Sequence, residues 1–176
     1  MQRPSLTRYA ILSIIGAVLT IALKFTAYLL TGSVGLLSDA MESIINLLAA
    51  GMMLGMLIIA TRPADDQHQF GHEKAEYFSS GAEGLLILIT ALLIGYTAIE
   101  RFFAPQPIEQ LDLGVGIAVV AALINLTLSR ILMRAGRQYD SGALQADAQH
   151  LMVDVWTTAG VLIGLDMAPS SGSMVC

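Results

Sequence analysis

Long apolar runs alternate with short polar segments along most of the chain. Five of these runs reach the roughly 20 mainly apolar residues that an α-helix needs to cross about 30 Å of hydrocarbon. The pattern predicts five membrane-spanning helices, at residues 9–30, 34–60, 77–99, 113–133 and 143–165. We therefore expect an all-α fold, a polytopic transmembrane helix bundle over residues 1–167, followed by a flexible tail at 168–176.

Composition supports an integral membrane protein, because 55% of the 176 residues are hydrophobic and only 13% are charged. The net charge of −5 argues against a nucleic-acid partner, which would need a basic face to neutralise phosphates. The only cysteine is Cys176, so the chain cannot form an internal disulfide or a cysteine-based metal cluster. Any metal chemistry must use His, Asp, Glu and Asn.

Basic residues in the short connections set the expected orientation, because cytoplasmic loops carry an excess of Lys and Arg. If the spans alternate in direction, Arg101 stands alone on one side of the membrane. The other side holds Arg3, Arg8, Arg62, Lys74, Arg130, Arg134 and Arg137. We expect a multi-pass protein of the plasma membrane, the inner membrane in a bacterium, with a cytoplasmic N-terminus.

Two predicted spans carry polar residues with the same spacing, in DAMESIIN at 39–46 and DAQHLMVD at 147–154. In each, two polar residues four positions apart share one helix face: Glu42 and Asn46, then His150 and Asp154. At about 1.5 Å per residue, both pairs lie about 10–18 Å from the start of their span, near the middle of the membrane. The four side chains could therefore share one metal ion.

Other interpretations of these residues stay open at this point. Polar side chains inside a membrane can simply form hydrogen bonds between helices. Ionisable groups there cost several kcal/mol unless they are paired, hydrated or functional, which favours a functional site. Asp39 and Asp147, three residues before each pair, could support the ligands, line a pore or cap a water-filled vestibule.

A second polar cluster follows the second predicted span, where Asp65, Asp66, His68 and His72 lie within eight residues. Histidine nitrogens and carboxylate oxygens are suitable zinc ligands. Surface loops often contain such residues without a metal, so the spacing alone leaves both interpretations open.

The motifs TGSVGLLSDAMESIIN, RPADDQHQFGHEKAE and ADAQHLMVD together resemble the cation diffusion facilitator family of divalent-metal/proton antiporters. The resemblance implies a four-ligand transport site between the second and fifth spans, which maps onto Glu42, Asn46, His150 and Asp154. In some members a further metal site lies in the loop after the second span. That site would map onto Asp65, His68 and His72.

The chain departs from the family in its ligands and in its length. Family members usually have His or Asp where this chain has Glu42, and Asp where it has Asn46, so this site carries one negative charge fewer. The family has six spans followed by a cytoplasmic metal-sensing domain that supports a homodimer. Since the chain ends after its fifth predicted span, we expect it to lack the sixth span and that domain.

The resemblance implies efflux of a divalent cation by proton antiport, with no permanently bound cofactor. Nitrogen and oxygen ligands favour Zn²⁺ or Fe²⁺ and leave Mn²⁺, Co²⁺ and Ni²⁺ open. His150 is the best candidate for proton exchange, because imidazole changes its charge near neutral pH.

Two alternatives differ from a working transporter. A truncated, non-transporting subunit could pair with a full-length chain. An intramembrane metalloenzyme is disfavoured, because the chain lacks the HExxH pattern of zinc proteases.

Overall fold

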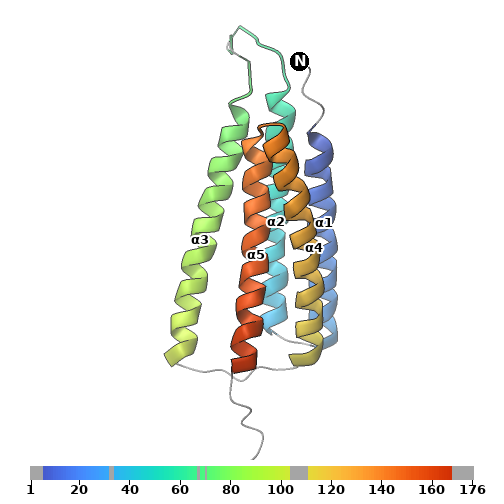
Figure 1. The fold of residues 1–176 in the computed structure, drawn as a ribbon, viewed down its shortest axis with the longest axis vertical. Helices are drawn as coiled ribbons and strands as arrows, with labels where there is room; N and C mark the ends of the chain where they lie inside the picture. The colour runs from blue at the N-terminus through green and yellow to red at the C-terminus, as the bar shows by residue number, and fades with distance from the viewer. Residues whose placement is uncertain (1–5, 32–33, 67, 70, 104–110, 168–176) are drawn as a thin grey trace, which may run out of the picture.

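The computed structural model describes residues 6–31, 34–66, 68–69, 71–103 and 111–167 (Figure 1). This part of the chain forms five helices and no strand, which confirms the expected all-α bundle. The expected tail at 168–176 lies outside the described residues. The helices are α1 (Thr7–Thr31), α2 (Val34–Ala60), α3 (Ala75–Phe103), α4 (Leu111–Gln138) and α5 (Gly142–Met167).

Successive helices run in opposite directions, so the N-terminal end of α1, the α2–α3 loop and the α4–α5 turn lie at the same end of the bundle (Figure 1). We call this the N-terminal end. Helix α1 packs against α2 and α4, and α5 packs against α4, α3 and α2. Helix α3 stands at the side of the bundle (Figure 1), in contact with α2 and α5. Helix α5 is therefore covered from three directions.

Four helices are long and apolar enough to cross a membrane over their described residues, namely α1, α2, α3 and α4. Their outer faces carry large exposed apolar side chains such as Leu30, Leu92 and Phe103, as lipid-facing helices require. Helix α5 is not among the four. It carries Asp147, His150 and Asp154 in its described part, and all three are buried inside the bundle.

The apolar core lies in the half of the bundle nearest the N-terminal end. It joins α1, α2, α4 and α5 through fully buried side chains that include Ala10, Met53, Leu132 and Leu144. At Gly16 the backbone of α1 approaches α4 so closely that an added Cβ would lie 2.0 Å from Leu128. Small residues thus let these helices pack tightly, as is usual in membranes.

The α4–α5 turn has a local sequence that explains its shape. Asp140 has a positive φ of 51°, a conformation that Asp and Asn adopt more readily than most residues. The next residue, Ser141, caps α5, because its hydroxyl oxygen accepts a hydrogen bond from the backbone N–H of Leu144 at 3.4 Å. This short turn fixes α5 beside α4, with its polar face toward the bundle interior.

Candidate metal site

Three of the four residues in the expected transport site touch one another. The Nδ2 atom of Asn46 donates a hydrogen bond to Oδ2 of Asp154 at 2.5 Å. The Nε2 atom of His150 lies 2.6 Å from Oδ1 of Asn46. Because an amide oxygen can only accept, Nε2 of His150 carries the proton in this arrangement. Asn46, on α2, therefore connects the imidazole of His150 to the carboxylate of Asp154, both of which belong to α5.

A fourth residue, Asn125 of α4, joins this group and was missed from the sequence. Its Nδ2 atom donates to the same Oδ2 of Asp154 at 3.2 Å. A lone amide near the middle of an apolar span was the available signal, but it had no repeated spacing to mark it. We call Asn46, Asn125, His150 and Asp154 the central cluster.

All four side chains of the central cluster are shielded from solvent and lie near the middle of their helices. The Nδ1 atom of His150 is buried and has no hydrogen-bond partner among the described residues. When Nε2 carries the proton, Nδ1 holds a free lone pair, which is the form of histidine that binds metals. A buried acceptor without a partner is costly, and this lone pair is not engaged by another described residue.

Glu42, the fourth expected ligand, is not drawn into the central cluster. It is half-buried one helical turn before Asn46, and it makes no hydrogen bond or ion pair with any described residue. Asn46 contacts His150 and Asp154 rather than Glu42. The carboxylate of Glu42 is consequently free of competing contacts from this part of the chain.

The two supporting residues, Asp39 and Asp147, are each held by α1. Oδ1 of Asp39 lies 2.8 Å from Nζ of Lys24, so the two charges form an ion pair between α2 and α1. The hydroxyl of Ser13 donates to Oδ2 of the fully buried Asp147 at 2.6 Å. These contacts tie α1 to the two helices that carry the expected ligands.

The loop at the N-terminal end brings together the second expected set of ligands. The ligand atoms of Asp65, His68 and His72 all lie within 4.8 Å of one another. Oδ1 of Asp65 is 3.1 Å from Nδ1 of His68, and Oδ2 is 3.4 Å from Nε2 of His72. The backbone N–H of His68 also donates to Oδ1 of Asp65 at 2.7 Å, which fixes the acidic side chain.

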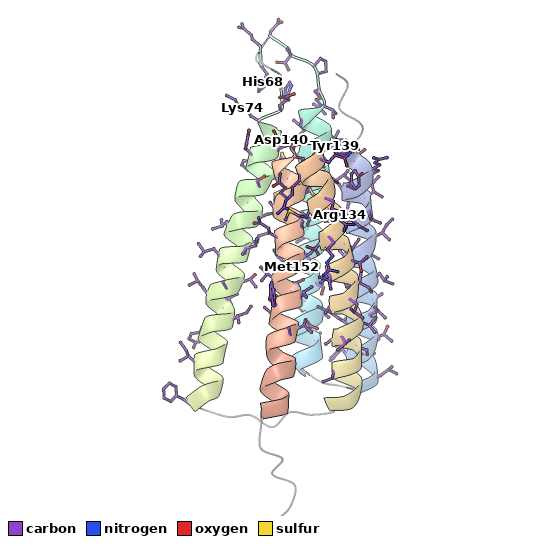
Figure 2. All side chains as sticks on the ribbon, viewed as in Figure 1. His68, Lys74, Arg134, Tyr139, Asp140 and Met152 are labelled. Atoms are coloured by element: carbon purple, nitrogen blue, oxygen red, sulfur yellow. The ribbon has the colours of Figure 1, made fainter. Side chains whose placement is uncertain are left out.

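Figure 2 shows His68 beyond the helix ends, at the N-terminal end of the bundle. Asp66, next to Asp65, is exposed and does not belong to the group. Within the described residues, the loop group alone holds three His, Cys, Asp or Glu ligand atoms this close together. Glu42, His150 and Asp154 would therefore have to move together to enclose an ion.

Comparison with known proteins finds related sequences over most of the chain. The model of the family described as cation efflux transmembrane domain matches residues 10–167. The chain is 53% identical to an uncharacterized transporter of Synechocystis sp. over 157 residues, which are 89% of this chain and 51% of the relative.

Other similar proteins carry a functional name. The chain is 30% identical to the cation-efflux pump FieF of Salmonella arizonae over 162 residues, which are 92% of this chain and 54% of that pump. The pump of the same name in Citrobacter koseri shows the same identity and coverage. The chain thus spans about half the length of these curated relatives. Since the family model covers nearly all of its residues, the chain belongs to the cation efflux transmembrane domain family.

Proposed function

We propose that this chain binds a divalent metal cation between α2 and α5 and moves it across the membrane in exchange for protons. The observation that carries the proposal is the unpartnered, buried Nδ1 of His150, whose side chain is joined to the buried Asp154 through Asn46. Family membership and the cation-efflux name of the FieF relatives support the same reaction class. They also favour a transporter over an intramembrane metalloenzyme.

The metal ligands in this proposal are Glu42, His150, Asp154 and the side-chain oxygen of Asn46. Without metal, the side chain of Asn46 forms hydrogen bonds with both His150 and Asp154. Metal entry would replace these contacts, with Nδ1 of His150 and both carboxylates turning to the ion. Two carboxylates balance the charge of a divalent cation, which offsets the free-energy cost of burying it.

Exchange with protons follows from the chemistry of these ligands. A carboxylate or an imidazole binds a metal only through a lone pair that a proton would otherwise occupy. Metal loading therefore releases protons, and protons arriving from the other side of the membrane favour metal release. His150 is the ligand best suited to this exchange near neutral pH.

The donor atoms limit the choice of metal without fixing it. One imidazole nitrogen and several oxygens suit Zn²⁺ and Fe²⁺, and the same set accepts Mn²⁺, Co²⁺ or Ni²⁺. Asn46 supplies a neutral oxygen, so the site attracts a cation less strongly than a version with aspartate there. We propose Zn²⁺ or Fe²⁺ as the transported ion.

The loop group is proposed as a second metal site, at the surface of the bundle. In a tetrahedral zinc site with bonds of about 2.1 Å, neighbouring ligand atoms lie about 3.4 Å apart. The separations of 3.1 and 3.4 Å from Asp65 to His68 and His72 are close to this value. These two separations involve different oxygens of Asp65, and the three ligand atoms lie within 4.8 Å of one another, so they would have to move closer together to hold an ion.

We place the N-terminal end in the cytoplasm of a cell whose plasma membrane holds the protein. Arg62 and Lys74 belong to the α2–α3 loop and Arg137 to the last turn of α4, and both segments lie at this end (Figure 1). An excess of basic residues marks the cytoplasmic side of membrane proteins. In the whole protein we further propose a homodimer.

Metal binding by the purified chain tests the proposal. Titration calorimetry with Zn²⁺ should show that His150→Ala weakens binding to the central site by at least tenfold. The control Gln149→Ala removes the exposed side chain one position away on α5 and should leave binding unchanged. Equal affinity in the wild type and in His150→Ala would exclude His150 as a ligand.

A non-transporting subunit that pairs with a longer chain is the alternative. It predicts that the purified chain binds metal, co-purifies with a complete relative and moves no metal alone. The proposed transporter predicts metal flux without any partner chain.

A further inference from the structure

Three arginines form a row along α4 near the N-terminal end. Arg130, Arg134 and Arg137 follow an i, i+4, i+7 spacing, so they share one face of the helix. All three are exposed, and none makes a hydrogen bond or an ion pair with another described residue. An unpaired guanidinium on the outer face of a membrane helix requires water or an anion.

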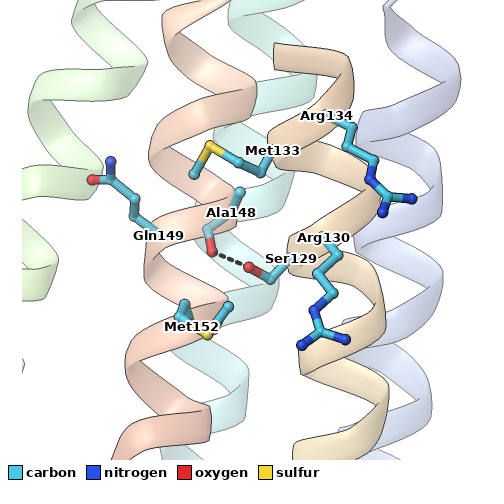
Figure 3. Close-up of a pocket in the computed structure, with 7 residues that line it drawn as sticks. All are labelled: Ser129, Arg130, Met133, Arg134, Ala148, Gln149 and Met152. Carbon is cyan, nitrogen blue, oxygen red and sulfur yellow. Dashed lines mark hydrogen bonds between the residues drawn. The ribbon is translucent and has the colours of Figure 1, made fainter. Parts of the chain in front are cut away.

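A pocket of about 270 Å³ opens between α4 and α5 beside two of these arginines (Figure 3). Arg130, Met133 and Arg134 line it from α4, and Ala148, Gln149 and Met152 line it from α5. A hydrogen bond of 2.7 Å from the Ser129 hydroxyl to the carbonyl of Ala148 joins the two helices there. The surface of the pocket is almost entirely apolar and includes Met133 and Met152, and the guanidinium groups of Arg130 and Arg134 extend along the α4 side, away from these methionines (Figure 3).

The position of the pocket along α4 matches the boundary between hydrocarbon and lipid headgroups. The 28 residues of α4 span about 42 Å, which exceeds the roughly 30 Å of a hydrocarbon core by about 12 Å. Arg134 and Arg130 lie four and eight residues before the end of the helix at Gln138, or about 6 and 12 Å from it. Long arginine side chains at this depth reach the headgroups while their stems stay in hydrocarbon.

We propose that this pocket binds an anionic phospholipid. Arg130 and Arg134 hold its phosphate, and an acyl chain lies in the groove against Met133 and Met152. The guanidinium fork matches phosphate oxygens and forms strong, charge-assisted hydrogen bonds with them. Basic side chains near the membrane surface attract anionic headgroups, and the apolar groove beside them can hold the acyl chain of the same lipid. The proposal does not depend on metal transport.

The only tryptophan of the chain provides a direct readout. Trp156 is 70% exposed and lies one turn beyond Met152 on the same face of α5. Bromine atoms on a lipid acyl chain quench tryptophan fluorescence only at close range. The purified chain is placed in bilayers that mix phosphatidylglycerol with phosphatidylcholine, with the bromine on one lipid or the other at equal content.

We expect stronger quenching when the anionic lipid carries the bromine, with a preference of about fivefold for each arginine. Arg130→Gln/Arg134→Gln should abolish the preference, and Arg130→Lys/Arg134→Lys should keep part of it. The control Arg62→Gln/Lys74→Gln removes the same charge from exposed positions in and beside the α2–α3 loop and should change nothing.

Three outcomes would overturn the proposal. The first is equal quenching by the two brominated lipids in the wild type. The second is a preference that survives Arg130→Gln/Arg134→Gln, and circular dichroism of that variant shows whether it is folded. The third is weak quenching by both lipids, which is what a protein segment covering the groove would produce.

Discussion

The substitution Asn46→Asp replaces the amide at the centre of the central cluster by a carboxylate of nearly the same shape. In the wild type, Nδ2 of Asn46 donates to Asp154 at 2.5 Å, and Oδ1 accepts from His150 at 2.6 Å. The variant keeps an acceptor for His150 but places a second carboxylate against Asp154. Because Asn46 is buried, solvent cannot screen the new contact effectively.

The expected loss of stability follows from these contacts. A buried hydrogen bond to a charged group contributes about 1.5–3 kcal/mol. Two like charges about 4 Å apart repel by about 4 kcal/mol at an effective dielectric constant of about 20, an upper limit because the pair can share a proton. We expect the metal-free variant to lose about 2–4 kcal/mol of unfolding free energy.

Metal should offset part of this loss of stability. A divalent cation held between the introduced carboxylate and the carboxylate of Asp154 replaces their repulsion with attraction to the ion. We expect Zn²⁺ to bind the Asn46→Asp variant at least tenfold more tightly than the wild type, which adds about 1.4 kcal/mol of stabilisation at equal, saturating metal. Unfolding of the purified chain in detergent, followed by circular dichroism with Zn²⁺ or with a chelator, measures both effects.

The control for this experiment is Gln138→Glu, which makes the same amide-to-carboxylate change at the exposed end of α4. It should shift stability by no more than about 0.5 kcal/mol, with or without metal. If Asn46→Asp were as stable as the wild type without metal and gained nothing extra from Zn²⁺, the contacts assigned to the central cluster would be wrong.

Three further predictions concern packing, the ion pair and the loop. Gly16→Ala should lower the free energy of unfolding by about 1–3 kcal/mol, because its Cβ would clash with the buried side chain of Leu128 on α4. Gly51→Ala, which has open space around it, should not lower it. Thermal unfolding of the two variants compares them. Lys24→Met should lower the free energy of unfolding by about 1–2 kcal/mol, a loss limited by the partial exposure of Asp39. In a double-mutant cycle, Lys24→Met/Asp39→Asn should recover most of this loss. His72→Ala should remove one bound Zn²⁺ per chain, and lowering the pH should weaken the remaining binding because protons compete for the ligands. A stoichiometry unchanged by His72→Ala would exclude the loop site.

The number and type of helices could be predicted from the sequence because membrane thickness sets the length of an apolar run. The structure confirms an all-α bundle, and its helices extend beyond the apolar runs by a few residues, as at Gln138. Those ends are polar and helical, since helix formation does not stop where the hydrocarbon does. Apolar content alone therefore could not locate the ends of the helices.

The i, i+4 spacing placed His150 and Asp154 on one helix face, and the structure joins both to Asn46. Their role as metal ligands stays a prediction. Asn125 could not be found in this way, because its contact with Asp154 depends on how α4 packs against α5. For the same reason, the choice of Lys24 as the partner of Asp39 required the structure.

Metal flux into proteoliposomes shows directly whether the chain transports a divalent cation through a site between α2 and α5. The purified 176-residue chain would be reconstituted without any partner into vesicles loaded with a zinc-sensitive dye, under an imposed pH gradient. We expect Zn²⁺ uptake that depends on the gradient and disappears in Glu42→Ala/His150→Ala. Uptake that the double variant retains, with the same dependence on pH, would contradict a transport site between α2 and α5.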